Sequence, residues 1–483
     1  MNILVVDAGT SGMKGLLLDE SGRCSLRLQR AYQPDYLPDG HVEQDPEDWV
    51  RALTQIVTES AHAASVDAIA LTSQRSSVLP VDDAGQPLHR AVMWQDKRNE
   101  SVCAGLKEYE QQIVSRCGSG VNTVYSGGKM AWFRKAEPVL WEKTKKLLVV
   151  PDYLIWHMTG QYRTDVTYGS RSLLMDLRTG QWDDTLLSIF GLDRDKLCEL
   201  VDVGSVIGTV HERFAAHCGL KAGIPVISGG GDQQCAALGL GVLSPGTVSI
   251  NLGTGAYLVE ATNTLPVQMC RDMVYGAAAI SGQYLLERSV LACCCAIDWF
   301  LDEFYSGRDY DHLETALRTS PVGARGVRCL PFFQGRSAPD WNSGMTGVFS
   351  GLTLSSHRED LLRALLEGLC FEIAEHLADM EDHVPAVSIR VSGGLSRSGQ
   401  FDQLLADVLG RDILVSDQAN ATAAGAWISA VTALGLYSSP EEAWRQIRPV
   451  EERAYHPNSA LAEVYEQNRQ EMRQLYQAAK KWH

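Results

Sequence analysis

Long apolar runs are missing from this sequence. No segment approaches the roughly eighteen uncharged apolar residues in a row that a membrane-spanning helix needs, and the chain starts directly on a short apolar segment of strand length. We therefore expect neither a membrane span nor a signal peptide.

Paired cysteine motifs are missing as well. The twelve cysteines are scattered apart from one run at Cys293, Cys294 and Cys295, and none shows C-x-x-C spacing with histidines at ligand distance. Zinc binding is therefore not expected. Reduced cysteines that serve as small core residues are typical of cytoplasmic proteins, so we expect a cytoplasmic location.

Positive charge is in short supply, because 43 Lys and Arg face 59 Asp and Glu and the formal net charge is −16. This balance argues against nucleic acid or an acidic membrane surface as a partner. A polyphosphate substrate would need local neutralisation by Mg²⁺, lysine and backbone amides.

The length of 483 residues is too great for one core, so we expect two domains of more than about 200 residues each. The content of 45% apolar and 21% charged residues is ordinary for a soluble globular enzyme. Ser244-Pro245-Gly246 marks a candidate boundary. We predict an N-terminal domain over 1–243, a C-terminal domain over 244–440 and a helical tail over 441–483.

The start of the chain predicts a β-hairpin around a glycine-rich turn. Apolar segments at Ile3–Val6 and Lys14–Asp19 flank the turn Gly9–Gly12. Backbone N–H groups in such a turn, together with the hydroxyls of Thr10 and Ser11, suit phosphate oxygens. An ordinary surface hairpin is the alternative, because a glycine-rich turn alone is a weak signal.

Two charged residues and a partial repeat strengthen the phosphate interpretation. Asp7 at the rim of the turn is a candidate Mg²⁺ ligand, and Lys14 on the returning strand can reach the same space. The pattern of apolar strand, Gly-Thr turn and apolar strand recurs at Thr247–Leu252, Gly253-Thr254-Gly255 and Ala256–Glu260. The repeat suggests two domains of similar design that each offer a hairpin to a shared cleft.

Polar residues follow two apolar strand-like segments in the first half of the chain. Ser73-Gln74-Arg75-Ser76-Ser77 follows Ala68–Thr72, and Trp94-Gln95-Asp96-Lys97-Arg98 follows Ala91-Val92-Met93. Open α/β sheets bind ligands at such strand ends. An aromatic wall beside Gln, Asp and Arg suits a polyhydroxyl compound, so we favour a substrate site over a pair of solvated loops.

Three consecutive glycines precede an acidic residue in Gly229-Gly230-Gly231-Asp232, between a strand at Pro225–Ser228 and a helix at Cys235–Gly241. The glycines bring the backbone close to another group, and the helix dipole favours an ionised Asp232. A simple helix cap is the alternative, although a cap does not require this clearance.

Another glycine pair, Gly393-Gly394, follows a strand at Val387–Val391 and can admit a nucleobase and ribose against bare backbone. Apolar periodicity elsewhere predicts further elements. These are a helix that Asp45-Pro46 opens, helices over 289–305, 357–380, 421–431 and 461–480, the last of them on the surface, and a strand over 330–333.

With these motifs placed, the sequence resembles the FGGY family of carbohydrate kinases, in the actin-like and hexokinase-like ATPase class. The resemblance covers roughly residues 3 to 440 and rests on six motifs in the same order. They are DAGTSGMK from Asp7, SGGKMAWF from Ser126, GGGDQQCAALG from Gly229, NLGTGAYLV from Asn251, GVFSGLTLSSHREDLLRALLE from Gly347, and SGGLSRSGQFDQLLADVLG from Ser392.

The resemblance implies an α/β protein with two RNase H-like domains around a central cleft, and ATP and Mg²⁺ as ligands. It implies Asp232 as the general base that takes a proton from the acceptor hydroxyl, and Asp7 as the Mg²⁺ ligand. The acceptor would contact Arg75, Ser76, Trp94, Asp96 and Gln233. ATP would contact Thr10, Ser11, Lys14, Gly253, Thr254, Gly393, Gly394 and Ser398.

Several positions depart from the best-known members of this family. Glycerol kinases have Gln-Arg-Glu where this chain has Gln74-Arg75-Ser76, and a tyrosine where it has Val124. Xylulokinases have Met-His at Arg75-Ser76. On the nucleotide side, Cys294, Asp298 and Ser398 replace a Gly, a Gln and an Asn of glycerol kinases.

We therefore predict an ATP-dependent kinase for a primary hydroxyl of a small polyol or ketose, without naming the acceptor. A hydrolase or a kinase for a non-sugar acceptor is one rival. A nucleotide-gated binding or chaperone-like member of the same ATPase class is another. The expected partners are ATP and a small sugar or polyol, with no nucleic acid and no membrane, and a homodimer is the candidate assembly.

Overall fold

The computed structural model describes residues 1–416, 420–448 and 452–482. The fold is α/β, as predicted, and the chain divides into two compact units. The first unit contains Met1–Leu243, Asn263–Leu285 and Asn420–Arg448, and the second contains Ser244–Thr262, Leu286–Ala419 and Pro449–His483. The division predicted from sequence stays a prediction. Asn420–Arg448, which we assigned to the C-terminal domain and tail, groups with the first unit.

A six-stranded sheet in the order β14-β15-β6-β1-β2-β3 is the framework of the first unit. β1 and β2 form the predicted antiparallel hairpin, whereas β1, β6 and β15 are parallel neighbours. The carboxyl ends of these three strands therefore meet at one edge of the sheet. The strands are β1 Asn2–Ala8, β2 Gly12–Asp19, β3 Cys24–Ala31, β6 Ala68–Ser73, β14 Val206–Thr209 and β15 Pro225–Gly231.

Helix α1, Pro46–Ala63, begins where the sequence predicts a helix. The Asp45 side chain accepts a hydrogen bond from the Glu47 N–H at 3.0 Å, and Pro46 occupies the first helical position. Trp49 and Leu53 are fully buried, as are Ile56 and Val57 one turn further on. The helix thus packs its apolar face against the sheet.

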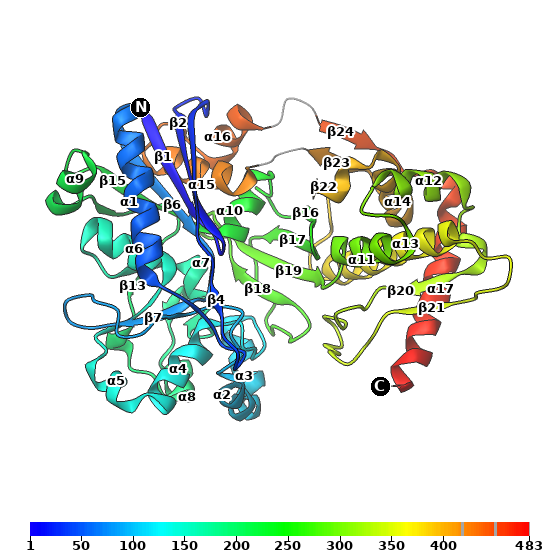
Figure 1. The fold of residues 1–483 in the computed structure, drawn as a ribbon, viewed down its shortest axis with the longest axis horizontal. Helices are drawn as coiled ribbons and strands as arrows, with labels where there is room; N and C mark the ends of the chain where they lie inside the picture. The colour runs from blue at the N-terminus through cyan, green and yellow to red at the C-terminus, as the bar shows by residue number, and fades with distance from the viewer. Residues whose placement is uncertain (417–419, 449–451, 483) are drawn as a thin grey trace. The chain divides into compact units, whose positions relative to one another are not determined.

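Helices α10, Asp232–Gly239, and α15, Ala421–Ala433, pack with their backbones in direct contact. A Cβ atom at Gly425 would lie 1.9 Å from the carbonyl oxygen of Cys235, and one at Gly239 would lie 2.0 Å from that of Ala421. Figure 1 shows α15 and α16, in orange, beside the blue strands of the same unit. The glycines of α10 and α15 therefore allow the two helices to pack closely against each other.

The first unit also contains a five-stranded sheet in the order β4-β5-β8-β7-β9. Its strands are Asp35–Tyr36, Val42–Gln44, Ala91–Val92, Val78–Val81 and Lys146–Val149. The remaining helices are α2 Glu100–Leu106, α3 Glu110–Cys117, α4 Ser126–Ala136, α5 Pro138–Lys143, α6 Val150–Thr159, α7 Val166–Gly169, α8 Asp184–Phe190, α9 Glu212–Cys218 and α16 Pro440–Ile447. Short strands are β10 Arg163–Asp165, β11 Met175–Asp176, β12 Gln181–Trp182, β13 Glu199–Val201 and β18 Val274–Ala277.

The sheet of the second unit runs β19-β17-β16-β22-β23-β24. β16 and β17 form the second predicted hairpin, and β16 pairs in parallel with β22. The strands are β16 Thr247–Leu252, β17 Ala256–Thr262, β19 Tyr284–Val290, β20 Arg328–Leu330, β21 Val348–Ser350, β22 Ser388–Gly393, β23 Ile413–Ser416 and β24 Glu452–Tyr455. The helices are α11 Cys294–Phe304, α12 Asp311–Thr319, α13 Arg358–Glu381, α14 Gly399–Leu409 and α17 Ala462–Ala479.

Four predicted elements have different boundaries in the structure. The helix expected over 289–305 starts only at Cys294, because residues up to Val290 complete β19. The strand expected over 330–333 ends at Leu330, since Pro331 lacks the N–H that would continue the ladder. β15 extends to Gly231, so α10 begins at Asp232 rather than at Cys235.

The predicted surface helix α17 is buried along one face, where Tyr465, Met472 and Tyr476 are covered. Among the described residues, no helix is both long and apolar enough to cross a membrane.

Candidate active site

Three strand ends bring the predicted acidic and basic residues of the first unit together. Asp7 of β1 pairs with Thr72 of β6, and Ser73 at the end of β6 pairs with Gly231 of β15. Asp232 directly follows the end of β15, and Arg75 follows the end of β6 after Gln74. Sheet register therefore places residues from distant parts of the sequence at one edge.

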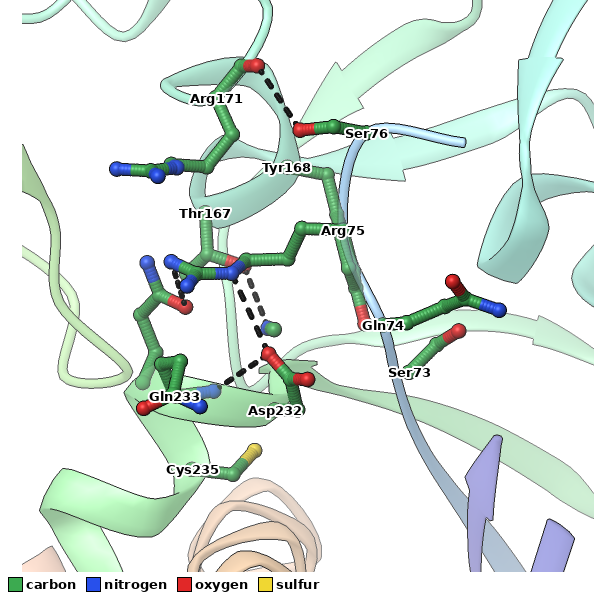
Figure 2. Close-up of polar contacts among 12 residues, drawn as sticks. Ser73, Gln74, Arg75, Ser76, Thr167, Tyr168, Arg171, Asp232, Gln233 and Cys235 are labelled. Carbon is green, nitrogen blue, oxygen red and sulfur yellow. Dashed lines mark hydrogen bonds and ion pairs between the residues drawn. The ribbon is translucent and has the colours of Figure 1, made fainter. Parts of the chain in front are cut away.

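Asp232 lies against Arg75 at this edge. The Arg75 Nε lies 3.3 Å from Asp232 Oδ1, and Arg75 Nη1 donates to Gln234 Oε1 at 3.4 Å (Figure 2). Asp232 is the first residue of α10, and its Oδ1 accepts a hydrogen bond from the Gln233 N–H at 2.7 Å. Its side chain is 30% exposed, so a ligand can approach the carboxylate from solvent.

The charges of Asp232 and Lys14 both affect the pKa of Asp7. Burial, followed by the negative charge of Asp232, raises the pKa of Asp7 to about 6, whereas Lys14 opposes the rise. Lys14 is the register partner of Asp7 across the hairpin and is exposed. A cation bound beside Asp7 would favour its ionised form.

The turn between β1 and β2 is fixed by hydrogen bonds. Gly9 N–H donates to the Gly12 carbonyl at 3.0 Å, and the Tyr32 hydroxyl donates to the Gly9 carbonyl at 2.8 Å. Thr10 Oγ1 donates to Gln74 Oε1 at 3.5 Å and accepts from Trp94 Nε1 at 3.1 Å. The residue predicted to contact phosphate thus touches a residue predicted to contact the acceptor. Ser11 in the same turn is exposed.

Ser76 and Asp96, which we also predicted to contact the acceptor, form hydrogen bonds within the first unit. Ser76 is buried with a left-handed φ of 72° and donates to the Arg171 carbonyl at 3.4 Å. Asp96 is fully buried, and its carboxylate accepts from the Val42 N–H at 2.6 Å and from Arg98 Nε at 2.9 Å. Burial opposes ionisation of Asp96, but these hydrogen bonds outweigh it and lower its pKa. The acceptor-binding roles of Ser76 and Asp96 stay predictions.

The second unit gathers its predicted nucleotide residues at the end of β16. Leu252, before the turn Gly253-Thr254-Gly255, pairs with Gly393 at the end of β22. A Cβ at Gly393 would lie 2.3 Å from the Leu252 carbonyl oxygen, so the glycine is needed for this close approach. Apart from its chain neighbours, no heavy atom of the described residues lies within 4 Å of a Cβ built at Gly394.

Backbone groups at the start of α11 hold the same turn. Cys293 N–H donates to the Thr254 carbonyl at 2.8 Å, and Cys294 N–H donates to the Gly253 carbonyl at 3.0 Å. Ser398, a predicted adenosine contact, caps α14 by accepting from Phe401 N–H at 3.2 Å and also donates to Glu314. Its contact with ATP stays a prediction.

Sequence reasoning missed a group of residues around α7 that contacts the triple-glycine run. Thr167 and Tyr168 bond to Gly231 and Gly230, respectively, and Asp165 bonds to Thr167. No motif marks these residues. The one local signal is Asp165, an acidic residue placed to cap a helix.

Two family models together match most of the chain. Residues 2–239 match the N-terminal domain, and residues 248–434 the C-terminal domain, of the FGGY family of carbohydrate kinases. The chain therefore belongs to the FGGY family of carbohydrate kinases. Its class is that of the ATP-dependent sugar and polyol kinases.

Individual relatives agree with this assignment. A glycerol kinase from Alkalilimnicola ehrlichii is 33% identical over 454 residues, which are 90% of each chain. A solved "xyloylose kinase" from Brucella ovis superposes with a TM-score of 0.93 at 24% identity over 100% of both chains. The Plasmodium falciparum glycerol kinase with ADP gives a TM-score of 0.91 at 24% identity, over 99% of this chain and 98% of that one. The two superpositions show the shared fold.

Proposed function

We propose that this kinase transfers the γ-phosphate of ATP to a primary hydroxyl of a small polyol or ketose, with Asp232 as the general base. The observation that carries the proposal is the position of Asp232. It is a partly exposed carboxylate on the first turn of α10, at the strand edge that also bears Asp7 and Arg75.

The chemistry asks little of the base. Phosphoryl transfer passes through a loose transition state that needs positioning and charge neutralisation more than a strong base, so an aspartate suffices. The Arg75 guanidinium lies 3.3 Å from the Asp232 carboxylate, which is the group proposed to accept the proton.

The acceptor side of the proposal uses Arg75, Trp94 and Gln233, with Ser76 and Asp96 shaping the surroundings. Trp94 is 36% exposed, so its ring can form a wall beside a sugar. Asp96 holds Arg98 and the Val42 backbone, which supports a role in fixing the loop that carries Trp94.

The phosphate side uses the two Gly-Thr turns. Thr10, Ser11 and Lys14 in the first unit, and Gly253 and Thr254 in the second, would contact phosphate oxygens. Gly393, Gly394 and Ser398 would contact adenosine, and the open space beside Gly394 supports this part.

Mg²⁺ would be held by Asp7 together with phosphate oxygens of the nucleotide. Mg²⁺ prefers one or two carboxylates plus substrate phosphates over a protein-only cage. Asp7 fits as a hard oxygen donor next to the turn, and no cluster of three or more His, Cys, Asp or Glu suited to a metal occurs among the described residues. Bound there, the cation would neutralise charge on the transferring phosphoryl group. A nucleotide-gated binding protein without kinase activity is not favoured by the family assignment.

The test is an ADP-release screen of the purified protein with MgATP against glycerol, erythritol, D-xylulose, D-ribulose and 2-deoxy-D-ribose. We expect one class of acceptor to raise ADP release well above the rate in water. With that acceptor, Asp232→Asn should lower kcat by about 10²–10⁴-fold and leave ATP affinity nearly unchanged. Asp83→Asn, in an exposed turn of the same unit, is the control and should behave as wild type. Near-normal turnover by Asp232→Asn would refute the assigned base.

A further inference from the structure

The triple-glycine run before Asp232 is held in an unusual backbone conformation. Gly230 has a φ of 101°, and the pairing of β15 with β6 shifts register between Ser228 and Gly230. A shift at this point breaks the regular ladder next to Asp232. The direction in which α10 presents Asp232 therefore depends on groups outside the sheet.

Residues around α7 supply those groups. Thr167 Oγ1 accepts a hydrogen bond from the Gly231 N–H at 2.9 Å (Figure 2). The Tyr168 hydroxyl donates to the Gly230 carbonyl at 2.9 Å. Asp165 Oδ1 accepts from the Thr167 N–H at 2.7 Å and from the Thr167 hydroxyl at 2.5 Å. We call Asp165, Thr167 and Tyr168 the α7 clamp.

The hydroxyl of Thr167 has a fixed direction in this clamp. Because its hydrogen goes to Asp165, a lone pair is left to face the Gly231 N–H. The other Asp165 oxygen accepts from the Ser228 hydroxyl, at the opposite end of the glycine run. The Asp165 carboxylate thus bonds to Ser228 before the glycine run and, through Thr167, to Gly231 at its end. Both Asp165 and Thr167 are fully buried.

Close packing prevents the run from moving away from the clamp. A Cβ at Gly230 would lie 3.4 Å from Thr167 Oγ1 and 3.1 Å from Val203 Cγ2. A Cβ at Gly231 would lie 2.8 Å from Arg75 Cδ and 2.6 Å from Gln234 Oε1. The glycine backbone is therefore packed between the clamp and Arg75, and Asp232 comes directly after it.

We propose that Thr167 is a positioning residue for phosphoryl transfer: by holding the Gly231 N–H it aims the Asp232 carboxylate at the acceptor hydroxyl. The inference rests on the proposed role of Asp232 as the base. A purely structural role is the competing explanation, because buried hydrogen bonds also stabilise folds. The two differ in what happens when Asp232 is already disabled.

The first measurement uses Thr167→Val, which keeps the side-chain shape but leaves the buried Gly231 N–H without its acceptor. We expect kcat to fall by about tenfold to a hundredfold, since small misplacements of a reacting group cost rates of that order. The KM for ATP should change by less than about twofold, because no nucleotide contact is removed. Thr167→Ser keeps the hydroxyl and should restore kcat to within about threefold of wild type.

Thr144→Val is the matched control, because Thr144 is also a buried threonine of the first unit and its hydroxyl donates to the Leu140 carbonyl at 2.9 Å. It should keep wild-type kcat. If Thr167→Val is too unstable to purify, Tyr168→Phe tests the clamp in its place, since it removes the bond to the Gly230 carbonyl. We expect it to lower kcat by roughly threefold to tenfold.

The deciding measurement combines Thr167→Val, or Tyr168→Phe in its place, with Asp232→Asn. If the clamp acts through Asp232, the double variant should turn over at the rate of Asp232→Asn alone, within about twofold. The positioning role would be overturned if kcat of the double variant fell by the product of the two single-variant losses, or if the clamp variant alone kept wild-type kcat. The assignment of Asp232 as the base would stand in both cases. Near-normal kcat in Asp232→Asn alone would overturn both.

Discussion

The guanidinium of Arg75 and the carboxylate of Asp232 form an ion pair, with 3.3 Å between Nε and Oδ1. The two residues follow neighbouring parallel strands, β6 and β15, so sheet register brings them together. Arg75 is the better buried partner, with 14% of its side chain exposed against 30% for Asp232. Asp232 is thus the more solvent-exposed residue of the ion pair, and a substrate can reach its carboxylate.

We expect Arg75→Ala to weaken acceptor binding more than ATP binding, because Arg75 forms an ion pair with Asp232, the residue proposed to meet the acceptor hydroxyl. The KM for the acceptor should rise by tenfold or more, on the order of a lost charged hydrogen bond, with the KM for ATP within about threefold. Steady-state kinetics with each substrate varied in turn measure both values. A larger rise for ATP would move Arg75 out of the acceptor site.

Asp7→Asn should raise the Mg²⁺ concentration needed for half-maximal activity. Asparagine keeps an oxygen donor but loses the charge that attracts the cation, so a shift of about tenfold or more is expected. Titration of Mg²⁺ at fixed ATP measures it. Glu20→Gln, an exposed carboxylate just beyond β2, is the control and should leave the curve in place. An unchanged curve for Asp7→Asn would count against the proposed ligand.

Asp152→Asn should stabilise the protein at pH 8 but not near pH 4. Burial raises the pKa of Asp152 from 3.8 to about 7, so ionisation costs the native state stability as pH rises from about 4 to about 7. Asparagine avoids that cost and can still accept the bond from Val149 N–H at 3.0 Å. The expected gain at pH 8 is on the order of 2–4 kcal/mol.

Urea unfolding of both proteins at several pH values tests this expectation. The difference between them should grow with pH and level off above about pH 7. A difference that is independent of pH would show that Asp152 is not the group responsible.

Gly425→Ala should destabilise the first unit, because its Cβ would lie 1.9 Å from the Cys235 carbonyl oxygen in α10. Overpacking of this kind costs about 1–3 kcal/mol, and the displaced helix carries Asp232, so activity should fall as well. The control is Gly105→Ala in α2, where no heavy atom of the part of the chain that the structure describes lies within 4 Å of a built Cβ, the helix's own backbone aside. It should be neutral or stabilising by up to about 1 kcal/mol. Thermal unfolding compares the two, and equal midpoints would contradict the packing argument.

Local patterns were enough to predict the hairpins and the strand ends. Asp7, Arg75 and Asp232 each follow an apolar segment of strand length, so a common sheet edge could be expected. The α7 clamp could not be predicted, because the bond from Gly231 N–H to Thr167 joins residues remote in sequence and leaves no local mark. For the same reason the triple-glycine run indicated a close neighbour without revealing that Thr167 and Arg75 flank it.

Domain membership was equally hidden. The sequence predicted a helix over 421–431, but the contacts of Gly425 with Cys235 and of Gly239 with Ala421 in the structure show that its neighbour is α10. The start of α11 was predicted too early in the chain, at Ser289. Ser289 and Val290 are the last residues of β19, but their apolar spacing continues that of the following helix.

The late segment Asn420–Arg448 has a consequence for how the protein is made. Trp427 and Ile428 cover an apolar sheet face that includes Ile3 and Val5 from the start of the chain. During translation this sheet face stays exposed to solvent until Asn420–Arg448, near the end of the chain, has been synthesised. A truncated protein that ends before this segment would leave the apolar face exposed and would be prone to aggregate.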